Sequence, residues 1–251
     1  MATCNPISTP METKINLEEL EKENSNPNSS KYPCRNAIGN LMYAMICTRP
    51  DLSFTVSLLS RFQTKQSDAL WKLIKCVLRY LKNTINYQLV FKKDLSASPI
   101  IGYVDASFGT NDLQAHSTSG YIIKLFNNPI IWVSRRQDKV ALSTMIVEYY
   151  ALCEITRDII WLRQCVQFLG IHLTSPTTIF EDNASCIAIT KNPVKHKGTR
   201  ELDTRLFFVR DELNKTITLT YIPSSENLAD LFTKALPKER LVMLSTKINL
   251  S

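Results

Sequence analysis

Four acidic residues are the part of this sequence that could carry chemistry. Asp105 and Asp182 each stand at the end of a β-like run, in the segments IIGYVDAS and TIFEDN. If these runs are neighbouring parallel strands, both carboxylates emerge at one edge of the sheet, where open sheets bind ligands. Taken singly, an Asp that follows a strand more often serves to form a turn.

The other two acids, Glu148 and Asp230, stand in predicted helices. Apolar residues follow Glu148 at +4, +7 and +11, which is the stripe expected to pack on a sheet. An ionised Glu on that face is costly unless it is paired or bound to a metal. Alternatively, Glu148 stands at the edge of the stripe, and Asp230 in the first turns of a helix starting at Ser225; helix dipoles favour acids at both places.

Together the four acids could converge on one edge of a sheet. Carboxylates so close would repel one another unless divalent cations lay between them. Two Mg²⁺ ions held in this way activate water and stabilise the leaving oxygen in phosphodiester hydrolysis. Oxygen ligands favour Mg²⁺ or Mn²⁺ over zinc.

The elements predicted to position these acids form an α/β domain over residues 98–240. Three β-like runs with short connections indicate an antiparallel meander, and strands then alternate with helices around one central sheet. A long helix is expected to end at Gly170. The predicted strands are 100–106, 120–126, 129–134, 177–180 and 217–222, and the predicted helices are 143–169, 184–190, 202–213 and one from residue 225.

The chain before residue 98 has a different character. Residues 1–30 are polar and expected to be flexible, and we assign them no secondary structure. Residues 31–97 are predicted to be mainly helical, with helices over 36–48, 52–62 and 67–82, followed by a short strand over 87–91. Residues 241–251 form a C-terminal tail.

A basic stripe runs along the helix predicted over residues 67–82. Leu70, Ile74 and Val77 share its apolar face, and Ser67 or Asp68 can cap it. A stripe of this spacing can follow the phosphates of a nucleic acid, although it is more often the solvated side of an amphipathic helix. The stripe consists of Lys72, Lys75, Arg79 and Lys82.

Composition narrows the class of protein. The net charge is +7, and residues 31–97 hold eleven Lys and Arg against three Asp, which suits a polyanionic partner. No apolar run approaches the roughly 20 residues of a membrane span, and the N-terminus lacks the pattern of a signal peptide. Seven scattered Cys and three His predict reduced thiols and no structural zinc. Only six Gly are present, with no phosphate-binding loop.

A run of motifs then places the sequence beside a known family. In chain order, the motifs are CRNAIGNLMYAMICTRPDLSF, LWKLIKCVLRYLKNTINYQLVFKK, IGYVDAS, HSTSGYI, VALSTMIVEYYAL, IFEDNASCIAI and YIPSSENLADLFTKALP. In this order they resemble the C-terminal part of the Pol polyprotein of copia-type LTR retrotransposons over nearly the whole chain. Residues 31–97 resemble the thumb and connection of its reverse transcriptase, and residues 98–240 resemble its ribonuclease H domain.

The resemblance implies a ribonuclease H-like fold, a mixed five-stranded sheet flanked by helices. It implies an enzyme that cuts the RNA strand of RNA–DNA hybrids, with two Mg²⁺ ions, or Mn²⁺, held by Asp105, Glu148, Asp182 and Asp230. Glu181 is then a solvated neighbour of the site. The implied partners are an RNA–DNA hybrid or another duplex and other Pol products, with no membrane. The implied location is intracellular: the cytoplasm, a virus-like particle or the nucleus.

The sequence departs from the family pattern near the expected site. Ser107 and Phe108 replace an Asp-Trp pair, Ile146 replaces the first Glu of a Glu-Ala-Glu motif, and Phe207 replaces a His. Further departures fall at Gln114, Ala115 and His116 and at Arg200, Glu201 and Leu202. These changes remove polar groups and bear on substrate binding rather than on the fold.

The chain contains no Asp-Asp dipeptide, so we expect no polymerase activity. Met1 falls after the position where a polymerase palm would end, which predicts a fragment or remnant of a Pol polyprotein. Two alternatives remain at this level: a nucleic-acid-binding module that no longer cuts, and a transcribed remnant of a decayed element. The retention of all four acids favours the enzyme.

Overall fold

The computed structural model describes residues 3–22, 32–65, 67–94, 96–109, 116–192 and 203–251. The chain forms two compact units. The helical unit consists of the described residues of Met1–Val90 together with Lys234–Ser251, and the sheet unit consists of those of Phe91–Thr110 and Gln114–Thr233. The boundaries predicted at residues 30, 97 and 240 concern the ancestry of the segments and stay a prediction.

The helical unit follows the sequence prediction closely from residue 34 to residue 83, whereas helix α1 lies in the segment that was predicted to be flexible. The predicted helices before Pro50 and after it are both present. They are separate because proline disfavours a helical conformation in the residue that precedes it. Among the helices of the described residues, none combines the length and the apolar composition that crossing a membrane requires. The helices of this unit are α1 (Leu17–Lys22), α2 (Cys34–Cys47), the 3₁₀ turn η1 (Pro50–Leu52), α3 (Ser53–Ser60), α4 (Asp68–Asn83) and α9 (Lys238–Lys247).

Helix α4 shows why the local prediction succeeds. The hydroxyl of Ser67 accepts a hydrogen bond from the backbone N–H of Leu70 at 3.0 Å, which caps the first turn. Ile74 and Val77 are fully buried together with Leu70, so the apolar face faces the core of the unit. The opposite face carries the basic stripe.

A buried charged network ties the turn at η1 to helix α4. Arg49 contacts both oxygens of Asp51, with Nε–Oδ1 at 3.0 Å and Nη2–Oδ2 at 2.7 Å. The hydroxyl of Tyr80 donates to Asp51 Oδ2 at 2.6 Å, and Arg49 Nη2 donates to Thr84 Oγ1 at 2.6 Å. Burial and the adjacent Asp51 raise the pKa of Tyr80, so its hydroxyl stays protonated and remains a donor.

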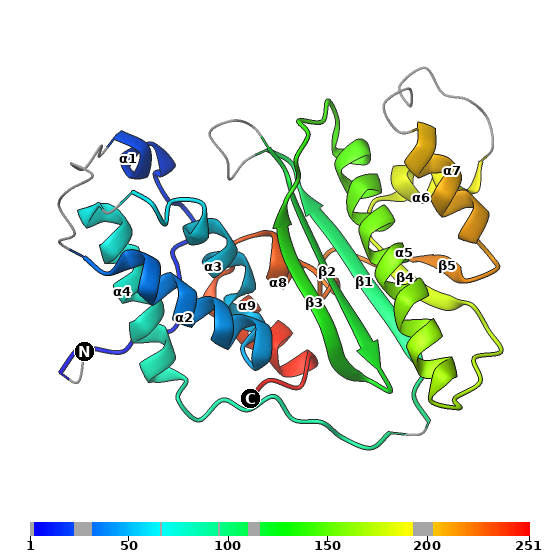
Figure 1. The fold of residues 1–251 in the computed structure, drawn as a ribbon, viewed down its shortest axis with the longest axis horizontal. Helices are drawn as coiled ribbons and strands as arrows, with labels where there is room; N and C mark the ends of the chain where they lie inside the picture. Colours follow the sequence, from blue (N-terminus) through cyan, green and yellow to red (C-terminus); the bar gives the residue numbers. More distant parts are fainter. Residues whose placement is uncertain (1–2, 23–31, 66, 95, 110–115, 193–202) are drawn as a thin grey trace. The chain divides into compact units, whose positions relative to one another are not determined.

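The sheet unit contains the predicted mixed five-stranded sheet flanked by helices, so the α/β fold class is confirmed (Figure 1). The strand order is β3-β2-β1-β4-β5. The pairs β1–β2 and β2–β3 are antiparallel, whereas β1–β4 and β4–β5 are parallel. The strands are β1 (Ile100–Ser107), β2 (Thr118–Leu125), β3 (Asn128–Arg136), β4 (Thr177–Glu181) and β5 (Ile217–Tyr221).

The long helix α5 (Thr144–Phe168) packs on one face of β1 and β2. Gly102 allows this close approach, because a Cβ there would lie 2.8 Å from Ile155 Cδ1 and 3.3 Å from Ile159 Cδ1. Ile155 and Ile159 are both fully buried in the main apolar core. The hydroxyl of Ser143 accepts a hydrogen bond from the N–H of Ile146 at 3.4 Å and caps the helix. A helix was predicted from this residue onward.

The one-turn helix α8 (Asp230–Thr233) packs on the opposite face of the sheet. Tyr121 of β2 points toward α5, where its hydroxyl donates to Asp158 Oδ2 at 2.6 Å. The preceding Gly120 therefore faces the other way, toward Phe232 of α8. Two further helices, α6 (Ala184–Lys191) and α7 (Asp203–Glu212), contact α5 on its side of the sheet.

Three predictions of secondary structure are wrong in detail. The strand expected over 87–91 reduces to a single bridge between Leu89 and Leu250. The helix expected from Ser225 starts only at Asp230, because Asn227 turns the preceding segment back onto β1. Helix α9 lies mostly within the expected tail, where the sequence analysis predicts no helix.

Candidate metal centre

Asp105 and Asp182 stand at equivalent positions on adjacent parallel strands. The β1–β4 register pairs Ile101 with Thr178 and Tyr103 with Phe180, an offset that also relates residue 105 to residue 182. Asp105 lies just beyond the last of these pairs, and Asp182 directly follows β4. The two carboxylates therefore emerge at the same edge of the sheet, as the sequence predicted.

Glu148 reaches this edge from helix α5. Ile155 lies over Gly102, and Glu148 lies seven residues earlier, about 10 Å along the helix. Three residues of strand from Gly102 to Asp105 cover about the same length. The contact at Gly102 therefore aligns Glu148 with the carboxyl end of β1.

The three acids form one cluster. One carboxylate oxygen from each of Asp105, Glu148 and Asp182 lies within 4.8 Å of the others. Asp105 and Glu148 are buried, at 5% and 6% exposure, and Asp182 is half-buried. A donor set made only of carboxylate oxygens fits Mg²⁺ or Mn²⁺ and does not fit a thiolate-seeking metal.

Glu181 corrects a sequence-based expectation. It is not a solvated neighbour of the site, since its side chain is fully buried at the end of β4. Oε1 accepts a hydrogen bond from the N–H of Asn183 at 2.9 Å, which shapes the turn into α6. Burial, with Asp182 and Asp105 adding to it, raises the pKa of Glu181 well above its usual range.

Asp230 is buried near this edge but does not join the cluster of three. It begins helix α8, whose last residue, Thr233, donates a hydrogen bond to Asp105 Oδ2. Two residues that sequence reasoning missed hold this segment: Thr233 itself and Asn227, whose Nδ2 donates to the carbonyl of Val104 at 2.8 Å. Their only sequence signal was their place beside Asp230.

The departures from the family pattern lie in different surroundings. Ile146 is buried in the apolar core that packs α5 on the sheet, so its replacement of a Glu adds to packing. Phe108 and Phe207 are exposed. The expectations for Ala115 and Glu201 lie outside the described residues.

The basic stripe of α4 is partly engaged by the chain's own N-terminal segment. Arg79 Nε donates to the carbonyl of Asn5 at 2.6 Å, and Lys82 Nζ donates to that of Cys4 at 2.9 Å. Lys72 and Lys75 are exposed. Of the four residues predicted to bind nucleic acid, two therefore already bind backbone carbonyls.

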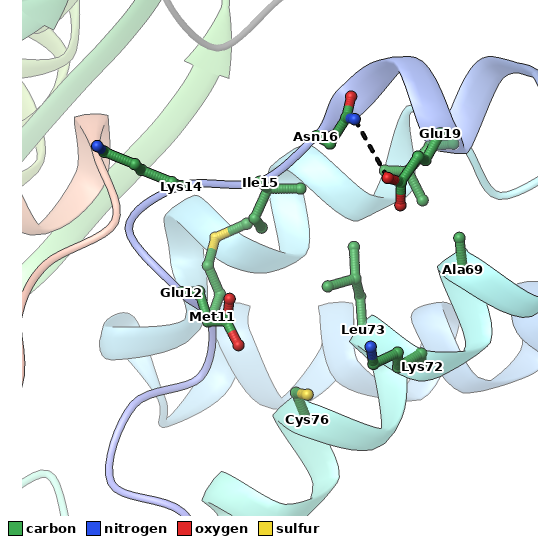
Figure 2. Close-up of a pocket in the computed structure, with 11 residues that line it drawn as sticks. Met11, Glu12, Lys14, Ile15, Asn16, Glu19, Ala69, Lys72, Leu73 and Cys76 are labelled. Carbon is green, nitrogen blue, oxygen red and sulfur yellow. Dashed lines mark hydrogen bonds between the residues drawn. The ribbon is translucent and has the colours of Figure 1, made fainter.

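The same N-terminal segment forms a pocket of about 160 Å³ with the first turns of α4. Figure 2 shows residues 11–19 lying across Ala69, Lys72, Leu73 and Cys76. Leu20 is buried, and Asn16 Nδ2 donates to Glu19 Oε1 at 3.2 Å. Within the described residues 3–22, the segment left without predicted structure is thus packed on the helical unit.

Known proteins similar to this chain are parts of transposon polyproteins. The chain is 33% identical over 248 residues, 96% of its length, to the retrovirus-related Pol polyprotein from transposon TNT 1-94 of Nicotiana tabacum. It is 31% identical over 249 residues, 99% of its length, to that from transposon RE2 of Arabidopsis thaliana. Over nearly its whole length, the chain has retrovirus-related Pol polyproteins of copia-type transposons as its homologues. The resemblance to copia-type elements is confirmed.

The match covers only part of each of these polyproteins. The chain spans 18% and 17% of the length of these two Pol polyproteins. It is also 41% identical over 130 residues to secreted RxLR effector protein 161 of Plasmopara viticola, covering 52% of this chain and 91% of that protein. No protein-family model matches the chain.

Solved ribonuclease H structures overlap the chain partially. The N-terminal RNase H domain of a Mycobacterium tuberculosis protein is 12% identical, with a TM-score of 0.40, over 59% of this chain and 96% of that one. LC11-RNase H1 in complex with an RNA/DNA hybrid is 17% identical, with a TM-score of 0.41, over 53% of this chain and 93% of that one. Because both scores are below 0.5, the fold class rests on the observed sheet.

Proposed function

We propose that the sheet unit is a metal-dependent ribonuclease that hydrolyses the RNA strand of RNA–DNA hybrids. The observation that carries the proposal is the convergence of Asp105, Glu148 and Asp182 at the carboxyl ends of two adjacent parallel strands. Buried like charges destabilise a fold unless a cation or a proton offsets them. The presence of three such carboxylates at one place therefore supports a role in metal binding. Similarity to Pol polyproteins over nearly the whole chain supports the same proposal.

The proposed cofactor is Mg²⁺, with Mn²⁺ as a substitute. Asp105, Glu148 and Asp182 would hold one metal ion. Asp230 would be a further ligand, for a second ion. Bound there, the ions would activate water and stabilise the leaving oxygen. The role of the chain's own carboxylates would be to hold the ions at this edge of the sheet.

The proposed substrate is a hybrid duplex bound by shape and backbone charge, with little sequence specificity. Lys72, Lys75, Arg79 and Lys82 are proposed to contact phosphates. Lys72 and Lys75 are exposed, although Lys72 also lines the pocket formed with the N-terminal segment. For Arg79 and Lys82 the same contact requires release of the carbonyls of Asn5 and Cys4.

Association with other Pol products is part of the same proposal, and an intracellular location stays a prediction. The helical unit is proposed to act as a duplex-holding appendage descended from the thumb and connection of a reverse transcriptase.

A cleavage assay tests the proposal. The purified chain is incubated with an RNA–DNA hybrid labelled on the RNA strand, with Mg²⁺ or with EDTA, beside an Asp182→Asn variant. We expect metal-dependent cutting of the RNA strand that is lost in EDTA and in the variant. Single-stranded RNA and duplex DNA serve as matched substrates and are expected to stay intact. Hybrid binding without cutting by the wild type would overturn the enzymatic assignment in favour of a binding module.

A further inference from the structure

Helix α8 is clamped onto the sheet where the acids converge. Asp105 of β1 pairs with Gly120 of β2, so the two residues face the same side. Thr233 lies over both: its hydroxyl donates to Asp105 Oδ2, and its methyl group occupies the space where a Cβ of residue 120 would stand. That Cβ would also lie 2.9 Å from Phe232 Cβ. Only glycine at position 120 lets α8 come this close.

A second contact holds the start of the same segment. Asn227 is fully buried, and its Nδ2 donates to the carbonyl of Val104, the residue before Asp105. Its Oδ1 accepts from the N–H of Ala229 at 3.0 Å. The segment is thus fixed to β1 by Asn227 before Asp230 and by Thr233 after it, and both contacts fall within one residue of the same carboxylate.

A hydroxyl that donates to one carboxylate oxygen restricts rotation of the whole carboxylate. Groups that orient metal ligands in this way change metal affinity, because the ligand no longer loses that freedom when the ion binds. Thr233 is fully buried, so water does not compete for this hydrogen bond. The contact spans 128 residues of sequence and is therefore a product of the fold.

We propose that Thr233 is a positioning residue of the metal centre, which orients Asp105 through its hydroxyl and depends on the missing side chain at Gly120. The inference rests on the proposed function, since it concerns the same carboxylates. Thr233 contacts neither metal nor substrate in this role. It acts on the affinity for the ion and leaves the chemistry of the occupied site almost unchanged.

The test compares the wild type with Thr233→Val, which keeps the shape without the hydroxyl, and with Thr233→Ser, which keeps the hydroxyl. Calorimetric titration with Mn²⁺ alone measures metal affinity without any activity. We expect about 10–100-fold weaker binding for Thr233→Val and near-wild-type binding for Thr233→Ser. Hybrid cleavage should need correspondingly more Mg²⁺ in Thr233→Val, with a saturated rate close to that of the wild type. Gly120→Ala, which displaces Thr233 while keeping its hydroxyl, should also weaken Mn²⁺ binding.

Several results would overturn the proposal. Equal Mn²⁺ affinity in Thr233→Val and the wild type, with hybrid cleavage intact, would remove the role of Thr233 and leave the ribonuclease proposal standing. An equal loss of Mn²⁺ affinity in Thr233→Ser and Thr233→Val would show that the hydroxyl of Thr233 does not cause the effect on metal binding. No Mn²⁺ binding and no cleavage by the wild type would remove both proposals. If circular dichroism shows Thr233→Val unfolded, Thr233→Ala replaces it, and failure of both to fold would assign Thr233 to stability instead.

Discussion

The helical unit and the sheet unit differ in how their buried charged residues are arranged. In the helical unit, Arg49 and Asp51 stand two residues apart and form a buried ion pair. In the sheet unit, Asp105 and Asp182 come from different strands. Burial raises the pKa of Glu181 beside them, and the two Asp carboxylates add to that rise. The first arrangement contains its own counter-charge and serves the fold, whereas the second accumulates like charges. A cluster of acids such as Asp105, Glu148 and Asp182 could hold a metal ion.

The largest effect on activity is expected from a substitution in the acidic cluster of Asp105, Glu148 and Asp182. Glu148→Gln removes one charge but keeps the shape of the side chain, so we expect hybrid cleavage to fall by about 10²–10³-fold, the loss typical of one stabilising group. The free energy of unfolding should stay the same or rise, because one like charge leaves a buried cluster. Cleavage rates and urea unfolding on the same preparation measure both. A large loss of stability would instead make Glu148 a structural residue.

The converse change breaks the paired network of the helical unit. Asp51→Ala leaves Arg49 buried without its partner, which should lower the free energy of unfolding by about 3–5 kcal/mol. Urea unfolding followed by circular dichroism measures the change. Asp51→Asn is the matched control and should cost less, because it can still accept from Tyr80. Undiminished stability of Asp51→Ala would mean that the ion pair contributes nothing to the fold.

Metal addition should act on one unit only. An ion present at ten times its Kd stabilises the native state by about 1.4 kcal/mol, so Mg²⁺ should raise the melting temperature of the wild type. Glu148→Gln should show a smaller shift. Thermal denaturation with Mg²⁺ and with EDTA gives the comparison. An equal shift in both proteins would place the ion elsewhere.

The smallest expected effect concerns the basic stripe. Each phosphate-binding side chain that is neutralised should reduce the slope of log K against log salt by about one. We expect Lys75→Gln to reduce the slope, whereas Arg79→Gln should change it less, because Arg79 already donates to Asn5. Fluorescence anisotropy of a labelled hybrid between about 50 and 200 mM salt measures both slopes. A larger effect of Arg79→Gln would mean that the N-terminal segment yields readily to nucleic acid.

Local signals in the sequence predicted most of the secondary structure. Ser67 caps the helix that it was expected to cap, since capping depends on residues a few positions away. The helix predicted from residue 143 is capped by Ser143. The convergence of Asp105 and Asp182 was predictable because strand ends on adjacent parallel strands share an edge. The burial of Glu181 could also have been predicted from strand alternation, because Thr177, Ile179 and Glu181 lie on one buried face of β4.

Interactions between distant segments were beyond sequence reasoning. Nothing near Thr233 indicates that its hydroxyl meets Asp105, because that hydrogen bond depends on the absence of a side chain at Gly120. The engagement of Arg79 by Asn5 joins residues 74 positions apart, so helical spacing alone described the stripe as open. Asp230 was assigned to a longer helix because the tie from Asn227 to Val104 cannot be read from local propensity.

The helical unit is discontinuous along the chain, and this has a consequence for biosynthesis. Gln88 and Ser251 exchange backbone hydrogen bonds at 2.9 and 3.2 Å, and Leu250 bridges Leu89. A ribosome releases residue 88 long before residue 251, so the contacts between these two ends of the helical unit form only after the whole sheet unit has been made. The sheet unit can close without them once Thr233 has emerged. During translation the unit whose helices emerge first is therefore completed last.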